Sequence, residues 1–171
     1  MTDEILFRSS RFHVARVNYS DGEETLVKEV VRHPGAAAIL PLLPHDRVCL
    51  IRNYRPTAGD YLLEIPAGTR EAGEPPADTA ARELTEETGY QAGKLEKLHE
   101  FYVSPGVLDE VIILYAATDL VQGDPHRESG ELIENQIVHW EDALAMVDDG
   151  RIHDAKTIIA LLYYDRLKRR L

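Results

Sequence analysis

Hydrophobic residues along this chain fall into short runs separated by turn residues, a pattern that predicts many strands. Phe7 to Tyr19 shows mixed alternation, and Thr25 to Val31 resumes a strand pattern after the turn signal Asp21-Gly22. We therefore expect a small antiparallel sheet within residues 4–32. Residues 35–43 (GAAAILPLL) form a continuous apolar run, typical of a strand buried on both faces, although periodicity alone leaves a helical segment open. Further strands are expected at 47–54, 95–103, 111–116 and 130–140.

Three segments have helical patterns. The first lies between Pro75-Pro76, which suit a helix start, and Gly89, which suits a helix end that needs positive φ. The second covers residues 141–149, and the third covers 154–171 with an apolar stripe along one side. Short strands around one helix, with further helices closing the chain, predict a mixed α/β fold.

Composition limits the class of partner. The chain has 171 residues and a formal net charge of −11, which argues against binding to a nucleic-acid backbone. No apolar stretch is long enough to span a membrane, so no membrane partner is expected. The single cysteine, Cys49, lies in an apolar run and is expected to be a buried strand residue. One cysteine permits no internal disulfide, which fits a reducing compartment, and we expect a cytoplasmic protein.

The first predicted helix carries an unusual cluster of carboxylates. Offsets of three and four residues share a helix face, so Glu83 projects beside Glu86 and Glu87. Like charges so placed destabilise a helix by about a few tenths of a kcal/mol per pair. Divalent cations would remove this penalty, because carboxylate oxygens are natural ligands of Mg²⁺ and Mn²⁺. An isolated cluster of this kind would instead indicate an acidic surface helix.

The spacing around this helix resembles the signature of the Nudix hydrolases. That signature is a glycine, five residues, a glutamate, seven residues and then Arg-Glu-aliphatic-x-Glu-Glu-x-Gly-aliphatic or aromatic. The chain matches it at every specified position, with Gly68, Glu74, Arg82-Glu83-Leu84, Glu86-Glu87 and Gly89-Tyr90. The resemblance covers roughly residues 30–165 and implies an α/β/α sandwich with a mixed sheet. It also implies hydrolysis of a nucleoside diphosphate linked to another group.

Three shorter segments resemble the ADP-ribose pyrophosphatase branch of that family. Residues 51–56 (IRNYRP) are similar to its QYRP strand end, and residues 64–68 (EIPAG) are typical of the branch. Pro105 stands about fifteen residues beyond the signature, at the branch's distinguishing proline, and is counted among the substrate-pocket residues. The branch implies an N-terminal antiparallel extension, residues 1–34, that helps form a homodimer ahead of a Nudix domain at 35–171.

The resemblance assigns roles to residues of the signature. It implies that two or three Mg²⁺ (or Mn²⁺) ions are held by Glu83, Glu86, Glu87 and the carbonyl of Ala67. Glu74 is expected to hold Arg82, which braces the helix, while Gly68 and Gly89 support the site structurally. Glu86 is counted among the catalytic residues as well.

Residues outside the signature have two interpretations each. Arg55 is expected to clamp the substrate diphosphate, and the alternative is an ion pair with Glu64 or Asp60. Arg32 is either a substrate contact or a solvated arginine before a turn. Glu110 either orients substrate or metal, or simply precedes the next strand.

The branch often takes its catalytic base from a late loop. Glu131 is the first candidate for that base, followed by Glu134 and then Glu128. The alternative is that all three glutamates are solvated loop charges.

The expected reaction is Mg²⁺-dependent hydrolysis of the ADP-ribose diphosphate to AMP and ribose 5-phosphate. One alternative is hydrolysis of another nucleoside diphosphate sugar such as GDP-mannose, because nothing in the sequence identifies the base. Another is a non-catalytic Nudix sensor that binds ADP-ribose. Such sensors usually have eroded signature glutamates or an attached DNA-binding domain, whereas this chain retains every glutamate.

Overall fold

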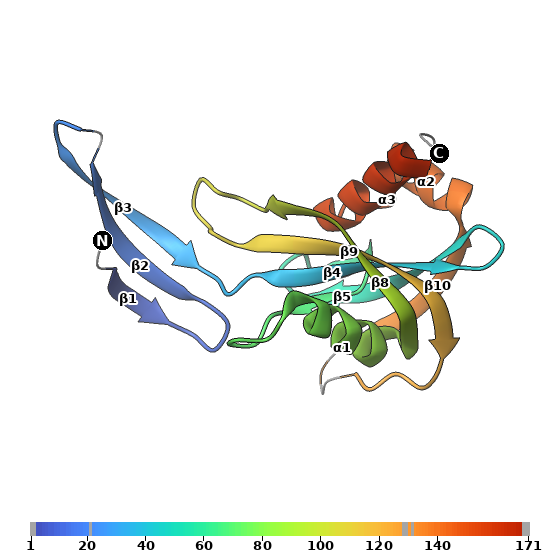
Figure 1. The fold of residues 1–171 in the computed structure, drawn as a ribbon. Helices are drawn as coiled ribbons and strands as arrows, with labels where there is room; N and C mark the ends of the chain where they lie inside the picture. The colour runs from blue at the N-terminus through green and yellow to red at the C-terminus, as the bar shows by residue number, and fades with distance from the viewer. Residues whose placement is uncertain (1–2, 21, 128–129, 131, 169–171) are drawn as a thin grey trace.

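The computed structural model describes residues 3–20, 22–127, 130 and 132–168. Within them, a three-stranded antiparallel sheet precedes a seven-stranded mixed sheet with three helices, which confirms the expected mixed α/β class (Figure 1). The small sheet has the order β1-β2-β3 and extends from one end of the molecule. Its strands are β1 (Glu4–Arg8), β2 (His13–Ser20) and β3 (Thr25–Arg32).

The strand pattern expected from Phe7 to Tyr19 is interrupted by a turn between β1 and β2. Ser9 forms this turn, because its backbone N–H donates to the Phe12 carbonyl at 2.9 Å and its hydroxyl accepts from the Phe12 N–H at 3.1 Å. The turn contains no glycine, proline or asparagine, so the sequence offered only a weak signal for it.

The large sheet has the order β10-β5-β4-β9-β8, with β6 paired to β5 and β7 paired to β4. Strands β4 and β9 are parallel, and the other described pairs are antiparallel. The strands are β4 (Ala36–Leu43), β5 (Arg47–Arg55), β6 (Asp60–Glu64), β7 (Ala67–Thr69), β8 (Tyr90–Tyr102), β9 (Val111–Gln122) and β10 (Ile133–His139). Strand β8 begins at Tyr90 rather than Leu95, and β9 continues to Gln122 rather than Ala116. The added parts of the two strands, residues 90–94 and 117–122, pair with each other and are mostly not buried. Their sequences therefore contain few of the regularly spaced apolar residues that indicate a strand.

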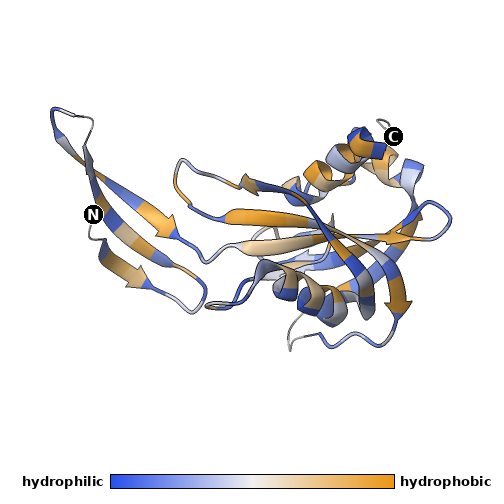
Figure 2. Cartoon of the chain, in the orientation of Figure 1, coloured by the Kyte–Doolittle hydropathy of each residue, from blue (hydrophilic) through white to orange (hydrophobic). Residues whose placement is uncertain are grey.

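Strand β4 is buried on both faces, as its apolar run predicts. Ile39 packs in a core cluster with Leu84 of helix α1 (Pro76–Thr88), whereas Leu40 packs in a second cluster with Trp140 and Leu161. Trp140 begins helix α2 (Trp140–Asp148), and Leu161 lies in helix α3 (Ala155–Lys168). Helix α1 therefore covers one face of the sheet, and α2 and α3 cover the other, with apolar strands between them (Figures 1 and 2).

Cys49 lies on β5 in the cluster beneath α1 and is fully buried, as expected. Burial raises the pKa of its thiol to about 12. In the described part of the chain, no helix is long and apolar enough to cross a membrane.

Candidate active site

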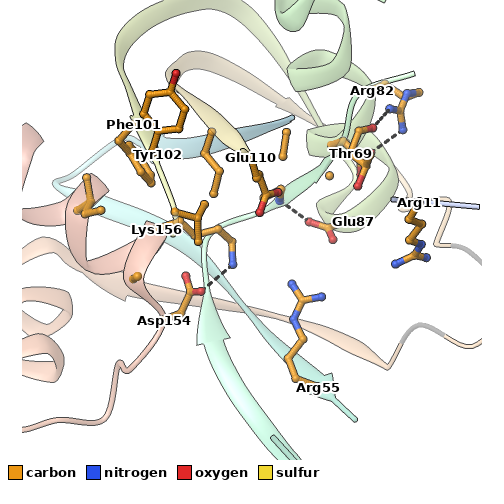
Figure 3. A pocket seen from close by; sticks show the side chains of 18 of the residues that line it. Arg11, Arg55, Thr69, Arg82, Glu87, Phe101, Tyr102, Glu110, Asp154 and Lys156 are labelled. Atoms are coloured by element: carbon orange, nitrogen blue, oxygen red, sulfur yellow. Dashed lines mark hydrogen bonds and ion pairs between the residues drawn. The ribbon is translucent and has the colours of Figure 1, made fainter. Parts of the chain in front are cut away.

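A cavity of about 470 Å³ lies where α1, β7, the end of β5, the end of β8 and the start of α3 meet (Figure 3). Six residues predicted to bind metal or substrate line it, together with Gly68 and Arg82, which were predicted to support the site. The six are Arg55, Ala67, Glu83, Glu86, Glu87 and Glu110. The structure thus brings the expected metal ligands and the expected phosphate ligand to one cavity.

Helix α1 has the boundaries that its flanking residues predict. Pro75 is the N-cap in an extended conformation, and Gly89 is the C-cap with φ of 81°. A Cβ at Gly89 would lie 2.5 Å from the carbonyl oxygen of Gly123, so both the backbone conformation and the close approach require glycine.

The C-terminal end of α1 is held by two side chains from the later part of the chain. Arg127 donates from Nε to the Glu87 carbonyl at 3.1 Å, and Asn135 donates from Nδ2 to the Thr88 carbonyl at 2.8 Å. These carbonyls belong to the last turn, where intrahelical partners are lacking. The bonds fix the end of the helix that carries the carboxylates.

Gly68 allows Glu83 to lie against strand β7. A Cβ placed on Gly68 would be 1.9 Å from the carboxyl carbon of Glu83. Any side chain at position 68 would therefore displace this carboxylate from the cavity wall.

Arg82 gathers three carboxylates around one guanidinium. Its Nη1 lies 2.7 Å from Glu83 Oε1 and 3.0 Å from Glu86 Oε2, while its Nε donates to Glu74 Oε1 at 3.1 Å. The hydrogen bond from Arg82, with one from the Glu71 backbone, lowers the pKa of Glu74 to about 2. The pKa of Arg82 is raised above its usual value, chiefly by Glu74. The expected contact between Glu74 and Arg82 is therefore present.

Glu87 is almost fully buried and accepts a hydrogen bond from the Ala67 N–H at 2.9 Å. This bond places its carboxylate beside the strand whose carbonyl is a predicted metal ligand. An all-oxygen donor set of Glu83, Glu86, Glu87 and the Ala67 carbonyl fits Mg²⁺ or Mn²⁺ in type. Among the described residues, no three acidic, histidine or cysteine side chains are already gathered as a metal-ligand group, and Glu83 and Glu86 both form ion pairs with Arg82.

A second charged cluster, made of Arg55, Glu64 and Lys156, lies across the cavity from the glutamates of α1 (Figure 3). The sequence analysis considered the pair of Arg55 and Glu64 but did not include Lys156. The Glu64 side chain is 1% exposed and accepts from Arg55 Nε at 2.7 Å and Nη2 at 2.6 Å. Lys156 Nζ donates to the same carboxylate at 2.6 Å. Burial alone would raise the pKa of Glu64, but the Arg55 hydrogen bond and the Lys156 charge outweigh it and lower the pKa. Arg55 therefore forms the alternative ion pair with Glu64 and still lines the cavity.

The start of α3 directs Lys156 toward this cavity. Asp154 caps the helix, because its Oδ2 accepts from the Thr157 N–H at 2.9 Å and also from the Thr157 hydroxyl. The Thr157 hydroxyl oxygen in turn accepts from the Ile65 N–H at 2.8 Å. An aspartate three residues before a threonine was the available signal, although it indicates a helix start and not a pocket.

Three described residues that were predicted to bind substrate or to act in catalysis lie outside the cavity lining. Arg32 pairs with Asp3 at 2.8 Å and with Asp109 at 3.0 Å. Pro105 occupies the exposed turn before β9. The Glu134 side chain is 72% exposed and lies 3.6 Å from Arg52. Their functional roles remain predictions.

Glu131 and Glu128 lie outside the described residues. The first choice for the catalytic base is therefore not located. The lining also includes residues that the sequence analysis did not predict for it, among them Arg11, Phe101 and Tyr102.

Comparison with known proteins agrees with this geometry. A family model described as NUDIX domain matches residues 31–161. This chain belongs to the Nudix family. It is 41% identical to an ADP-ribose pyrophosphatase of Bacillus subtilis (strain 168) over 138 residues, covering 80% of this chain and 75% of that protein. It is also 41% identical to a GDP-mannose pyrophosphatase of Yersinia pestis (strain Pestoides F) over 147 residues, covering 80% and 74%.

Two further matches extend over more of the chain. A methanol dehydrogenase activator of Bacillus methanolicus is 38% identical over 161 residues, covering 91% of this chain and 85% of that protein. A solved structure titled "Crystal structure of ADP compounds hydrolase" aligns with a TM-score of 0.83 at 24% identity, covering 99% of this chain and 93% of that chain. At that identity the match shows the fold alone, and its coverage includes the N-terminal sheet.

Proposed function

We propose that this Nudix protein is a divalent-metal-dependent hydrolase of nucleoside diphosphate sugars, with ADP-ribose as its main substrate. The products would be AMP and ribose 5-phosphate. The observation that carries this proposal is that Glu83, Glu86 and Glu87 line the same cavity as Arg55. GDP-mannose is the second candidate, because relatives named for each activity are equally identical to this chain.

The charge of the cavity supports a need for metal. Its lining carries four cationic and six anionic side chains, an excess of two negative charges. The cations are Arg11, Arg55, Arg82 and Lys156, and the anions are Glu71, Glu83, Glu86, Glu87, Glu110 and Asp154. A diphosphate would be repelled by this wall unless cations of the solution entered with it. Bound divalent cations supply charge neutralisation and Lewis-acid activation of water.

Each of the proposed site residues has a separate role in this mechanism. Glu83, Glu86, Glu87 and the Ala67 carbonyl would hold two or three Mg²⁺ or Mn²⁺ ions. Arg55 would donate to a phosphoryl oxygen, since Glu64 occupies its Nε and Nη2 and leaves Nη1 available. Glu74 would keep Arg82 in place beside the helix. Glu110 would orient the substrate from the cavity wall.

The reaction also needs a proton acceptor. Water attacks one phosphorus, the bond from that phosphorus to the bridging oxygen breaks, and the water proton passes to a carboxylate. Glu131 remains our first choice for this acceptor, followed by Glu134 and Glu128. Glu134 is less suited because its carboxylate faces solvent beside Arg52.

We also propose that residues 1–34 form a dimerising extension of a Nudix domain at 35–171. The small sheet leaves several apolar side chains exposed, namely Ile5, Leu6, Phe7, Phe12, Tyr19 and Val27. A second copy of the chain would cover them. Light scattering on the purified protein would test this, and a monomer at micromolar concentration would contradict it.

The activity test is a substrate panel with Mg²⁺ or Mn²⁺, containing ADP-ribose, GDP-mannose, ADP-glucose, NADH and diadenosine polyphosphates. We expect ADP-ribose to lead by about tenfold, equal to about 1.4 kcal/mol of transition-state preference. Glu83→Gln and Glu87→Gln should lower turnover by about 10² or more. Glu141→Gln on the exposed start of α2 is the matched control. Binding of ADP-ribose without cleavage under either metal would favour the sensor alternative.

A further inference from the structure

Arg11 differs from the other cations that line the cavity. Arg55 pairs with Glu64, Lys156 pairs with Glu64 and Asp154, and Arg82 pairs with three glutamates. The Arg11 side chain forms no hydrogen bond or ion pair with any residue that the structure describes. Figure 3 shows it across the cavity from Lys156 and Asp154.

The turn between β1 and β2 holds the backbone of Arg11 in place. The Ser9 hydroxyl accepts from the Arg11 N–H at 3.3 Å and from the Phe12 N–H at 3.1 Å, and it donates to the Phe12 carbonyl at 3.0 Å. Arg11 thus projects from a defined tight turn, and less conformational entropy is lost when its side chain binds a ligand.

Contacts between the small sheet and the Nudix core keep this turn beside the cavity. The Val31 N–H donates to the Val107 carbonyl at 2.8 Å, and the Asp109 N–H donates to the Val31 carbonyl at 3.1 Å. Arg32 joins Asp3, just before β1, to Asp109, just before β9. Arg32 therefore links the two ends of the small sheet to the core loop that leads to Glu110.

We propose that Arg11 is a substrate-binding residue that donates to a phosphoryl oxygen of the nucleoside diphosphate in the cavity. A guanidinium has planar donors that match phosphate oxygens, and no described residue accepts a hydrogen bond from the Arg11 guanidinium. The cavity is otherwise rich in carboxylates, so a cation at its edge that pairs with none of the described residues favours an anionic ligand over a neutral one. This inference rests on the proposed function, because it takes the ligand of the cavity to be a phosphoanhydride.

The test compares Arg11→Ala, Arg11→Lys and Arg8→Ala in the full chain, using ADP-ribose and Mg²⁺. Arg8 is the matched control, because it is an exposed arginine of the same sheet that does not line the cavity. We expect Arg11→Ala to raise KM about tenfold while kcat changes less than about threefold. Arg11→Lys should recover part of the loss, and Arg8→Ala should stay within about twofold of the wild type.

Two outcomes would overturn the assignment while leaving the proposed function intact. One is an active wild type in which Arg11→Ala and Arg8→Ala behave alike. The other is a fall in kcat with unchanged KM, which would place Arg11 outside substrate binding. Thermal unfolding of each variant shows whether the fold has been preserved.

Failure of the proposed function would be visible separately, as a wild type that cleaves no nucleoside diphosphate sugar. The same variants would then be compared for ADP-ribose binding by calorimetry. Weaker binding by Arg11→Ala than by Arg8→Ala would support the role of Arg11. Equal binding, or no binding by the wild type, would overturn it.

Discussion

Lys156 Nζ lies 2.6 Å from Glu64 Oε2, although the two residues are 92 positions apart in the chain. Their side chains are 10% and 1% exposed, so this ion pair belongs to the interior wall of the cavity. The same carboxylate binds Arg55, and one buried anion therefore connects the end of β5 with the start of α3. This connection gives the cavity wall a fixed charge arrangement.

Removal of Glu64 should destabilise the protein strongly. Glu64→Ala leaves Arg55 and Lys156 without their shared carboxylate, and breaking a buried pair costs about 3–5 kcal/mol. Arg55 is more than a third exposed, so solvent would reduce its share and a loss near the lower end is expected. Denaturant unfolding measures it. Lys156→Met in the Glu64→Met background should be better tolerated than Glu64→Met alone, since no buried Lys156 charge then remains.

Substitution of Arg55 should affect the reaction more than substitution of Arg52, which lies on the same strand outside the cavity lining. Arg55→Lys keeps the positive charge but loses the planar guanidinium. A lysine therefore cannot form the two parallel hydrogen bonds to Glu64 while a third nitrogen donates to a phosphoryl oxygen. We expect kcat/KM for ADP-ribose to fall about tenfold or more. Arg52→Lys, a change on the same strand outside the cavity, should stay close to the wild type. Equal losses in the two variants would contradict the role of Arg55.

Gly68→Ala should lower the activity of the protein more than its stability. Its Cβ would meet the Glu83 carboxyl group at 1.9 Å, and that flexible side-chain end would move away. Because Glu83 is a proposed metal ligand, we expect turnover to fall about 10²-fold, as misplacement of site groups can cause. Gly106→Ala is the control, since a Cβ there meets nothing within 4 Å. Metal titration of the activity should show a weakened Mg²⁺ response only in Gly68→Ala.

Ionised Glu74 should stabilise the folded protein, and this contribution should be lost at acidic pH. Its pKa falls from 4.5 to about 2 in the folded protein, chiefly through Arg82. A lowered folded pKa means that the stabilisation is present above pH 4.5 and is lost as the pH falls toward about 2. Glu74→Gln should therefore show a flatter stability curve than the wild type over this window. Glu96→Gln on β8 should keep the wild-type slope, and chemical denaturation at several pH values makes the comparison.

Helix α1 and its carboxylate face could be predicted because their signals are local. Pro75 and Gly89 mark the ends, and the spacing of Glu83, Glu86 and Glu87 places them on one face. The double burial of β4 was likewise evident from its uninterrupted apolar run. In each case a few neighbouring residues contain the whole signal.

The rest of the site depends on contacts between distant segments. Nothing near Lys156 indicates that it will share Glu64 with Arg55, because the fold alone brings them together. The position of Arg11 depends on a serine turn without glycine, proline or asparagine and on the way the small sheet joins the core. Ion-pair partners and sheet placement are tertiary properties, which a hydrophobic pattern does not contain.

The buried thiol of Cys49 gives the protein an internal reporter of core opening. With its pKa near 12 and no exposed surface, it should resist alkylation at neutral pH while α1 covers it. Any labelling must then follow detachment of the carboxylate-bearing helix or unfolding of the whole domain. The alkylation rate, compared with and without Mg²⁺, would measure how firmly cations hold that helix against the sheet.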